Sequence, residues 1–387
     1  MSLRILTLNV WGLPWPVGRD VPERIAAIGD ALPGLAPDVA AFQEAWTPDA
    51  RAALAEAGRR AGLPHAFPDP SGPGRGGLLV LSRHPLRGAG FVPYLLNGFP
   101  ERIDHADYWG GKGFVVCEVE APSGGIALIA THLHARYAPR PLDPYAGHRT
   151  AQVVQLAAAL RAISRPLVAV GDFNFEESFE EHAVLVGLAD LEDVARSLDR
   201  GQDTVRWPGS HRHLPGAGGA RIDYVFCRSG RDASWRPLGI ERVLDGPIEI
   251  DGHAANYSDH AGLVAELELA AGELVPGGVA LPPVDPSAVA LARHLLVEGR
   301  SAAAGRRGTL RWSGAGGLVA AAIAVRPGLR TRLSRRQVLG AGVATLAGLA
   351  GGGCLFLSEE IRPAELDAFD ATLRELDVLA GGAVESS

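Results

Sequence analysis

The sequence predicts an α/β protein built as a mixed layered sandwich, followed by a C-terminal helical and apolar extension. Residues 1–270 alternate short apolar runs with segments of helical spacing. Some of the runs are joined by Gly/Pro turns and others by helices, which indicates a mixed sheet rather than a purely parallel one. The composition, with 47% hydrophobic and 21% charged residues, is that of a folded chain.

The expected strands are short and apolar, and the expected helices carry one apolar face. We expect strands at Arg4–Val10, Val39–Gln43, Gly77–Ser82, Phe114–Val119, Ile126–His132, Leu167–Asp172, Ile222–Cys227 and Leu263–Glu268. We expect helices at Pro22–Leu32, Pro48–Ala61, Ala146–Ile163 and Glu177–Val186.

Composition changes near residue 271, and this change predicts four parts. The first part, 1–270, is a single large domain, and 271–312 is a Pro/Gly/Ala-rich linker with a short helix at about Ala288–Val297. Residues 313–357 form an apolar region of two uncharged runs separated by an arginine-dense segment, and 358–387 form an acidic amphipathic tail.

Charge and cysteine content limit the function classes. The net charge of −7 and a pI near 6.0 argue against a general nucleic-acid binder, which would carry a basic face, so we expect no nucleic-acid partner. The three cysteines form no C-x-x-C pair, which indicates a reducing compartment rather than a disulfide framework. The N-terminus shows no secretory signal pattern.

Polar residues end the first two expected strands. Asn9 ends the first and Glu44 follows the second. An amide and a carboxylate at neighbouring strand ends make a hard oxygen site that suits Mg²⁺. For either residue alone, a solvent-facing strand end is the simpler interpretation.

Two further strand ends carry paired polar residues. His132 and His134 point to one side if the strand stays extended, where two imidazoles could bind metal or hold a phosphoryl oxygen. Asp172 and Asn174 share a face for the same reason and could hold a leaving-group oxygen and an attacking water. A turn built on Gly-Asp and Asn is the alternative for the second pair.

A single acid, Asp223, lies inside the apolar run Arg221–Val225. A buried carboxylate is costly unless it is paired, and the simplest partner is the ring of His260. Asp223 would then fix the tautomer of His260, so that the other ring nitrogen can take a proton from water. Asp259, next to His260, would face a metal.

The order of these motifs, from Asn9 and Glu44 through the His-x-His and Asp-x-Asn pairs to Asp223 and Asp259-His260, resembles the endonuclease/exonuclease/phosphatase superfamily over about residues 3–269. The Thr-His-Leu-His-Ala run at 131–135 and Leu-Asn-Val-Trp-Gly-Leu-Pro at 8–14 are most similar to its neutral sphingomyelinase branch. The resemblance implies a four-layer sandwich of two mixed sheets flanked by helices.

The resemblance also implies a role for each motif residue. Glu44 would be the principal Mg²⁺ ligand, with Asn9 and Asp259 close to the metal, and Mn²⁺ could replace Mg²⁺. His260 would be the general base and Asp223 its orienting partner, and His132 would steady a phosphoryl oxygen. Asp172 and Asn174 would contact the phosphoryl group and water. Lys112 and His134 are expected to contact substrate; a lysine in a surface turn is the alternative for Lys112.

We therefore expect a Mg²⁺-dependent phosphodiester hydrolase, a sphingomyelinase-like phospholipase C that cuts a sphingolipid or phospholipid headgroup. A nuclease and an inositol-phosphate phosphatase of the same fold are the alternatives. An inactive membrane adaptor is the alternative from another class, and the complete set of acids, amides and imidazoles argues against it.

The apolar region predicts a membrane anchor. Val338–Leu357 has the length of a spanning helix, whereas Ser313–Val325 is too short to span, so we favour one span over a hairpin. The arginines at 326–336 place the hydrolase domain on the cytoplasmic face by the positive-inside rule. A Gly/Ala-rich helix packed on the domain is the alternative. Truncation after about residue 310 is expected to leave a soluble, competent hydrolase.

Overall fold

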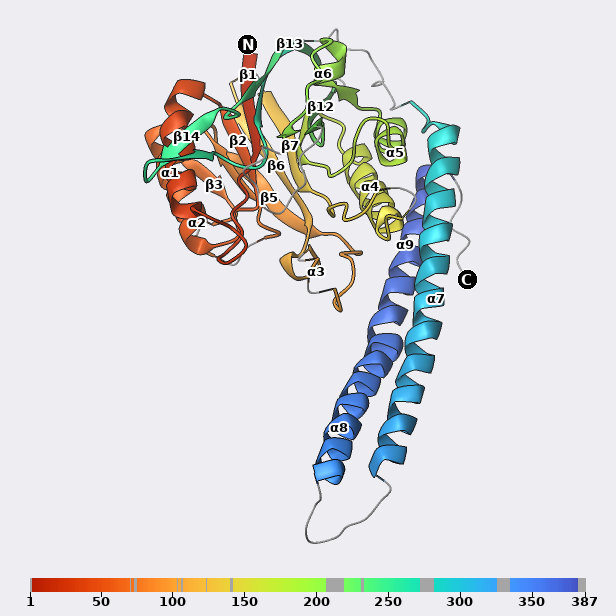
Figure 1. Cartoon of the computed structure of the whole chain (residues 1–387). Coiled ribbons are helices and arrows are strands. Elements are labelled where there is room, and N and C mark those ends of the chain that lie inside the picture. Colours follow the sequence, from red (N-terminus) through yellow and green to blue (C-terminus); the bar gives the residue numbers. More distant parts are fainter. Residues whose placement is uncertain are drawn as a thin grey trace.

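Two β-sheets pack face to face, helices cover their outer faces, and a long helical arm projects from one side (Figure 1). The computed structural model describes residues 2–69, 71–72, 75–102, 104–105, 107–122, 124–139, 142–206, 219–230, 233–271, 282–325 and 335–381. The arginine-dense segment therefore lies outside the described residues except for Arg335 and Arg336, and so do residues 272–281 of the expected linker.

Each main sheet has six strands of mixed direction. The first has the order β13-β16-β1-β2-β4-β3, with bounds Ala233–Val243, Gly262–Ala271, Ser2–Asn9, Val39–Gln43, Leu79–Ser82 and His65–Phe67. The second has the order β5-β6-β7-β8-β12-β9, with bounds Leu86–Pro93, Gly113–Ala121, Gly124–His132, Leu167–Asp172, Asp223–Arg228 and Glu192–Asp193. Two small ladders complete the strands, β10 (Val205–Arg206) with β11 (Gly219–Ala220) and β14 (Pro247–Ile250) with β15 (His253–Asn256).

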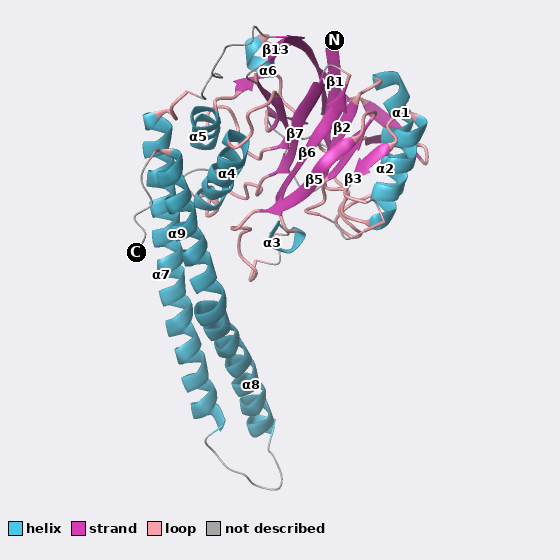
Figure 2. Ribbon diagram, turned by 180° about the vertical axis from the view of Figure 1, so that it is seen from behind, coloured by secondary structure: helices cyan, strands magenta, loops and turns pink. Residues whose placement is uncertain are grey.

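The helices make the outer layers (Figure 2). On the first sheet lie α1 (Val21–Leu35) and α2 (Pro48–Arg60), and on the second lie α4 (Ala146–Arg161) and α5 (Glu180–Ala189). Two short helices, α3 (Asp107–Gly110) and α6 (Val194–Ser197), sit in connections. The four-layer sandwich predicted from the sequence is confirmed.

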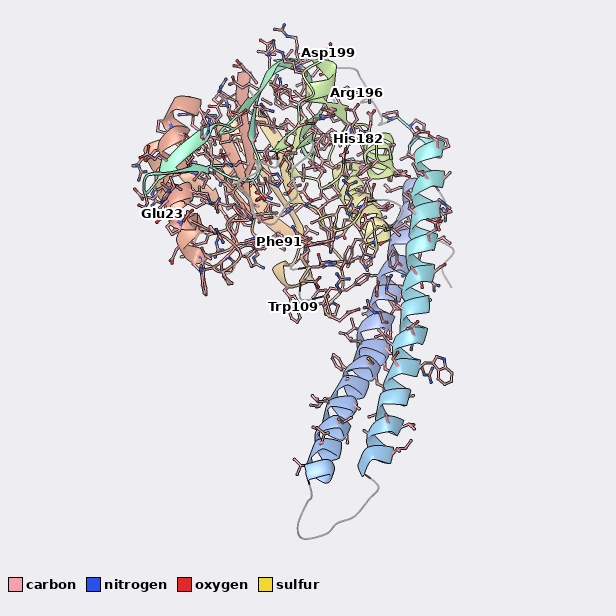
Figure 3. The ribbon with its side chains drawn as sticks, viewed as in Figure 1. Glu23, Phe91, Trp109, His182, Arg196 and Asp199 are labelled. Carbon is pink, nitrogen blue, oxygen red and sulfur yellow. The ribbon has the colours of Figure 1, made fainter. Side chains whose placement is uncertain are left out.

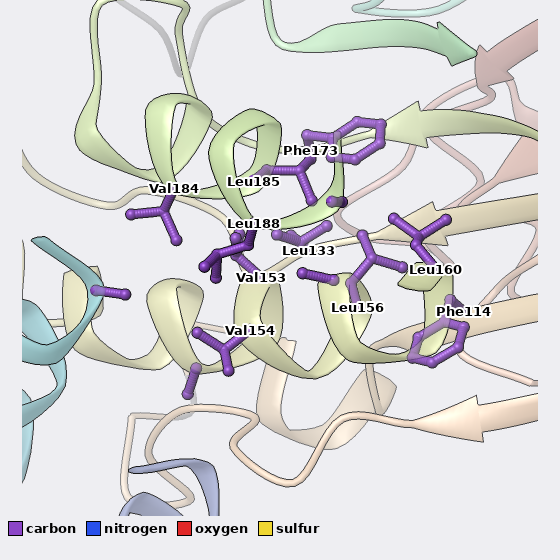
Figure 4. Close-up of a cluster of buried hydrophobic side chains, with 14 of the residues drawn as sticks. Phe114, Leu133, Val153, Val154, Leu156, Leu160, Phe173, Val184, Leu185 and Leu188 are labelled. Atoms are coloured by element: carbon purple, nitrogen blue, oxygen red, sulfur yellow. The ribbon is translucent and has the colours of Figure 1, made fainter. Parts of the chain in front are cut away.

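Three apolar cores match these layers. One fills the space between the two sheets, with Ile5 and Val80 from one sheet and Leu128 and Val170 from the other. The second lies under α1 and α2. The third lies under α4 and α5, where their leucines and valines pack against Phe173 (Figure 4). Both faces of the central strands are therefore buried, which explains why these strands are continuous apolar runs.

Strand register brings the expected site residues to one end of the sandwich. β1 and β2 are parallel and Asn9 pairs with Gln43, so Asn9 and Glu44 end neighbouring strands, as predicted. In the second sheet, Asp172 pairs with His132 on one side and Asp223 on the other. These three residues thus form one row across three adjacent strands.

The arm is a helical hairpin. It consists of α7 (Pro286–Val325), α8 (Arg335–Phe356), a π-helical turn η1 (Leu357–Ile361) and α9 (Arg362–Leu379). α8 and α9 run back along α7 (Figures 1 and 2). The two sides touch main chain to main chain, because a Cβ on Gly317 would lie 2.9 Å from the Cα of Gly351.

The base of the arm belongs to the core under α4 and α5. Ala292 and Leu296 of α7, and Phe369 and Leu376 of α9, are all fully buried in it. The short helix expected at Ala288–Val297 is thus the first part of a 40-residue helix that passes through the expected boundary at 312. The expectation that a chain truncated after 310 stays competent conflicts with this packing, because the truncation removes α9 from the core.

Candidate active site

The two sheets are joined at the site by the side chain of Asn9. Its amide nitrogen donates to Glu44 Oε1 at 3.1 Å and to Asp172 Oδ2 at 3.0 Å. Its amide oxygen accepts from the main-chain nitrogen of Trp11 at 3.0 Å. Asn9 therefore holds one carboxylate from each sheet at a fixed separation.

An acid–imidazole pair lies beside this bridge. His260 Nδ1 is 2.8 Å from Asp223 Oδ2, which is the pairing predicted from the sequence. The main-chain nitrogen of Asp223 donates to Thr204 Oγ1 at 3.1 Å, and the main-chain nitrogen of His260 donates to Ser258 Oγ at 3.2 Å. With Nδ1 occupied, His260 Nε2 faces the centre of the site, 3.8 Å from Asp172 Oδ2.

His132 and Lys112 form the third side. His132 Nε2 lies 3.3 Å from Asp172 Oδ2 and 2.6 Å from Lys112 Nζ. Lys112 is only 1% exposed, so the surface-turn alternative is wrong. Its charge is balanced by Asp107 Oδ1 at 2.8 Å. Lys112 thus brings a buried positive charge to the ring that is expected to hold a phosphoryl oxygen.

Two further expected residues, His134 and Asn174, contact main-chain carbonyls beside the central group. His134 stacks on Tyr145, and its Nδ1 is 2.8 Å from the carbonyl of Ala135 and 3.5 Å from Asp107. The rings of His132 and His134 thus contact different partners and do not form one two-histidine site. Asn174 Nδ2 donates to the carbonyl of Leu133 at 2.9 Å, which ties the segment after β8 to the segment after β7.

Unusual backbone conformations surround these side chains. Glu44 and Asn174 have φ values of 59° and 53°, a left-handed conformation that is uncommon for residues other than glycine and concentrates at functional sites. Gly171 precedes Asp172 with a φ of 143°, and a Cβ there would lie 2.0 Å from the carbonyl oxygen of Thr131. Only glycine can therefore bring β8 this close to β7 at the site.

The concentration of charge shifts several pKa values. Burial alone would lower the pKa of His260, but the Asp223 and Asp172 carboxylates outweigh it and raise that pKa well above its ordinary value. Burial raises the pKa of Asp172 less than the His260 and His132 rings lower it, so Asp172 stays ionised. Burial, with repulsion from Glu44, raises the pKa of Asp259 to about 6.

The donor set fits a hard divalent cation beside Glu44. Glu44 Oε2 is buried and has no hydrogen-bond partner among the described residues. Asp259 lies close enough for the charge of Glu44 to raise its pKa, and a divalent cation held by both carboxylates would offset this repulsion. Asp172, Asp223 and His260 also approach within 4.8 Å of one another, but the hydrogen bond of His260 to Asp223 already engages two of these groups.

Sequence reasoning assigned no role to Asp107 and did not single out Arg24. Asp107 accepts from Lys112, from the main-chain nitrogen of Ala135 at 2.7 Å and from the Tyr137 hydroxyl at 3.2 Å. Arg24, on α1, reaches four main-chain carbonyls, as described below. No local pattern marks either residue, because each acts on segments that are distant in the chain.

Comparison with known proteins identifies a family and several relatives. The Endonuclease/Exonuclease/phosphatase family matches residues 6–260. A provisionally named neutral sphingomyelinase of Drosophila melanogaster is 32% identical over 70% of this chain, and the match spans 61% of that protein. The inositol phosphosphingolipids phospholipase C of Schizosaccharomyces pombe is 30% identical over 51% of this chain and 47% of its own length. The chain thus spans less than two thirds of these relatives.

A solved structure has the same fold. The crystal structure of sphingomyelinase C from Streptomyces griseocarneus superposes with a TM-score of 0.52 over 69% of this chain and 99% of that chain, at 21% sequence identity. At this identity the likeness establishes the arrangement of sheets and helices alone.

Proposed function

Because this chain belongs to the Endonuclease/Exonuclease/phosphatase family, we propose that it is a metal-dependent phosphodiester hydrolase that cuts a sphingolipid or phospholipid between lipid and phosphate. The observation that carries the proposal is the meeting of His260–Asp223 with the Asn9 bridge between Glu44 and Asp172. The names of the Drosophila and fission-yeast relatives support a sphingolipid substrate.

The attacking group is water rather than a side chain. Ser258 Oγ donates to the main-chain carbonyl of Asn9 at 2.6 Å and is not free to attack. The thiols of Cys117 and Cys227 are buried, and burial raises the pKa of each to about 12. In its neutral form, His260 takes the proton from water at Nε2, and Asp223 stabilises the imidazolium that forms.

Charge on the phosphoryl group is matched by groups from both sheets. His132 and Lys112 present positive charge or hydrogen-bond donors to one side. The Asn9 amide keeps both of its N–H groups on Glu44 and Asp172 and so holds these two carboxylates in place. Glu44 and Asp259 would hold Mg²⁺ or Mn²⁺, which when bound supplies Lewis-acid polarisation of phosphoryl oxygens. Lipid oxygen is the leaving group, and a phosphorylated headgroup is released.

A headgroup-release assay tests this proposal. Choline, inositol and ethanolamine lipids are presented in mixed micelles with Mg²⁺, and duplex DNA is tested in parallel. We expect release from at least one lipid, strict dependence on the cation, and little DNA cleavage. Faster hydrolysis of DNA would favour the nuclease alternative, and full activity in excess chelator would refute the metal-dependent chemistry.

We also propose that the outer half of the arm is a membrane anchor. One helix, Val338–Leu379, is long and apolar enough to cross a membrane by length and composition. The side chains of Leu339, Leu346 and Leu349 are about 70% exposed, and Ile323 on α7 is exposed beside them. Glycine contacts between α7 and α8 resemble the close packing of membrane helices.

The packing of α9 favours a hairpin over the single span expected from the sequence. Both α7 before residue 313 and α9 contact the hydrolase domain, so the chain enters and leaves the membrane on the same face. In this arrangement arginines flank the apolar part at both ends, with Arg306, Arg307 and Arg311 at the hydrolase end. The positive-inside rule then no longer selects a face.

We propose that the hydrolase domain lies on the cytoplasmic face, because Cys117 and Cys227 are free thiols, as is usual in a reducing compartment. Flotation of the full chain with liposomes tests the anchor. The matched control excises residues 313–357 and joins 312 to 358 by a short loop, which keeps the base of the arm. Equal flotation of both proteins would refute the anchor, and protease protection in vesicles would assign the face.

A further inference from the structure

A cavity of about 830 Å³ lies beside the active site and has no assigned role. It is bounded by the loop after β1 and by the first turns of α1 and α2. Its buried floor is made by Gly18, Ile25 and Ala50. Its volume falls within the range of cavities that bind small ligands.

The cavity shares its wall with the active site. The loop leaves β1 directly after Asn9, and Gly12 donates its main-chain N–H to the carbonyl of Glu44 at 3.1 Å. A Cβ on Gly12 would lie 2.4 Å from that oxygen, so the loop rests against the main chain of Glu44. A ligand in the cavity would therefore touch the same loop that begins at Asn9.

Arg24 fixes this wall. Its guanidinium donates to the carbonyls of Trp11 at 2.7 Å, Val10 at 2.9 Å and Tyr257 at 3.1 Å, and its Nε donates to the carbonyl of Arg19 at 2.9 Å. The cavity wall is thus held by a buried side chain and is part of the folded structure rather than a loosely packed surface loop.

The chemistry of the cavity selects an uncharged, apolar ligand. Its floor is apolar, and Trp15 at its rim is 87% exposed, which leaves a large apolar side chain without cover. The exposed charges at the rim are three acids, Asp20, Glu23 and Asp49, against the single base Arg19. This excess of negative charge disfavours nucleic acid and free phosphate. Glu23 is labelled on α1 in Figure 3.

The position of the cavity agrees with such a ligand. β1 runs from the N-terminus at the top of the sandwich toward the lower end, past which the arm extends, and α1 and α2 lie on the side of the sandwich opposite the arm (Figures 1 and 2). If the arm is anchored in a membrane, this end faces the lipid surface. Trp109, which is exposed, lies at the same end (Figure 3).

We propose that this cavity binds one hydrocarbon chain of the lipid substrate while the phosphodiester lies at Glu44 and His260. This assignment rests on the proposed hydrolase function. The apolar floor takes the chain and Trp15 covers it. The cavity selects substrates by the presence and length of a chain, independently of the headgroup.

The test uses water-soluble phosphodiesters below their aggregation limit. One carries a chain of twelve carbons, and the other is a chainless nitrophenyl ester with the same headgroup. Ala53→Trp fills the cavity from α2, and Ala52→Trp on the same helix is the matched control, because Ala52 is exposed and does not line the cavity. We expect Ala53→Trp to lower kcat/KM about tenfold for the chain-bearing substrate alone, the loss expected for displacing about two methylene groups.

Binding of a fluorescent single-chain lipid to the full chain in the presence of Mg²⁺ gives a readout that needs no turnover. Ala53→Trp should weaken this binding and Ala52→Trp should not. Unchanged binding in Ala53→Trp, or equal loss of kcat/KM on both substrates with unchanged binding, would overturn the chain-binding site. Binding that follows a cationic head rather than chain length would assign the cavity to a headgroup instead. A wild-type chain that cleaves neither ester would refute the hydrolase proposal, and the binding measurement would still show whether the cavity binds a hydrocarbon chain.

Discussion

The substitution Phe369→Ala tests whether α9 is part of the hydrolase core. Phe369 is 0% exposed, its ring packs edge-on against His148 with centroids 5.4 Å apart, and it fills the space beside Gly299 of α7. Removing a buried phenylalanine ring costs about 3–5 kcal/mol, because contacts are lost and a cavity remains. A folded domain has a total stability of about 5–15 kcal/mol, so the loss should be a large fraction of it.

The measurement is urea unfolding in detergent micelles, followed by tryptophan fluorescence and by activity. The control is Val378→Ala on the same helix, where the side chain is 52% exposed and the expected change is within about 0.5 kcal/mol. If Phe369→Ala changes the free energy of unfolding by less than about 1 kcal/mol, α9 does not contribute to the core and the hairpin topology loses its main support.

Four further outcomes follow from the site and its supports. His260→Ala should lower kcat by about 10²- to 10⁴-fold with an unchanged circular dichroism spectrum, and turnover within a few-fold of wild type would exclude His260 as the base. Glu44→Gln should raise the Mg²⁺ concentration needed for half-maximal activity, measured by metal titration; an unchanged titration would place the cation elsewhere. In Arg24→Lys the lysine side chain cannot donate to all four carbonyls, so kcat and the midpoint of unfolding should both fall. Full activity would show that the loop after β1 keeps its position without these hydrogen bonds. Burial alone would raise the pKa of Asp193, but the His182 ring, 3.7 Å away, and the hydrogen bonds from Arg221 outweigh it and lower that pKa to about 2. The Asp193 carboxylate therefore stabilises the fold at pH values above its ordinary pKa of about 3.9, and this stability is lost as the pH falls toward 2. In Asp193→Asn the free energy of unfolding should depend less on pH between about 4 and 2. The same pH dependence as in the wild type would show that Asp193 is not the stabilising carboxylate.

Most of the central site residues could be predicted because they lie at or next to the ends of apolar strands. The polar residue at the end of such a run is visible in the sequence, and parallel pairing then brings Asn9 beside Glu44. Antiparallel pairing does the same for Asp172 and Asp223. The acid–imidazole pair could be predicted because a lone acid in an apolar strand needs a partner, and His260 was the simplest one.

Other features depend on contacts that no local pattern reveals. β5 and β13 were not predicted, because glycine and proline interrupt both, and each has an irregularity in its register. The length of α7 was underestimated because its glycines and arginines break the apolar spacing. Asp107 lies in a four-residue helix, and its hydrogen-bond and ion-pair partners come from two other segments of the chain. Its role is therefore defined only in the folded chain.

The π-helical turn η1 controls the phase of the long helix that contains it. A π-turn accommodates one extra residue, and each residue turns an α-helix by about 100°. The turn is tied to α7, because Arg307 Nε donates to the carbonyl of Ser358 at 3.1 Å. Before η1, the face of α8 that carries Gly351 packs against α7. After η1, Phe369 of α9 packs in the domain core. Deleting one residue from α8 or α9 outside η1 would rotate these two faces by about 100° relative to each other, so that either the arm or the core would lose its partner. The extra residue of η1 is the one whose removal would leave an ordinary α-turn and keep both faces in place.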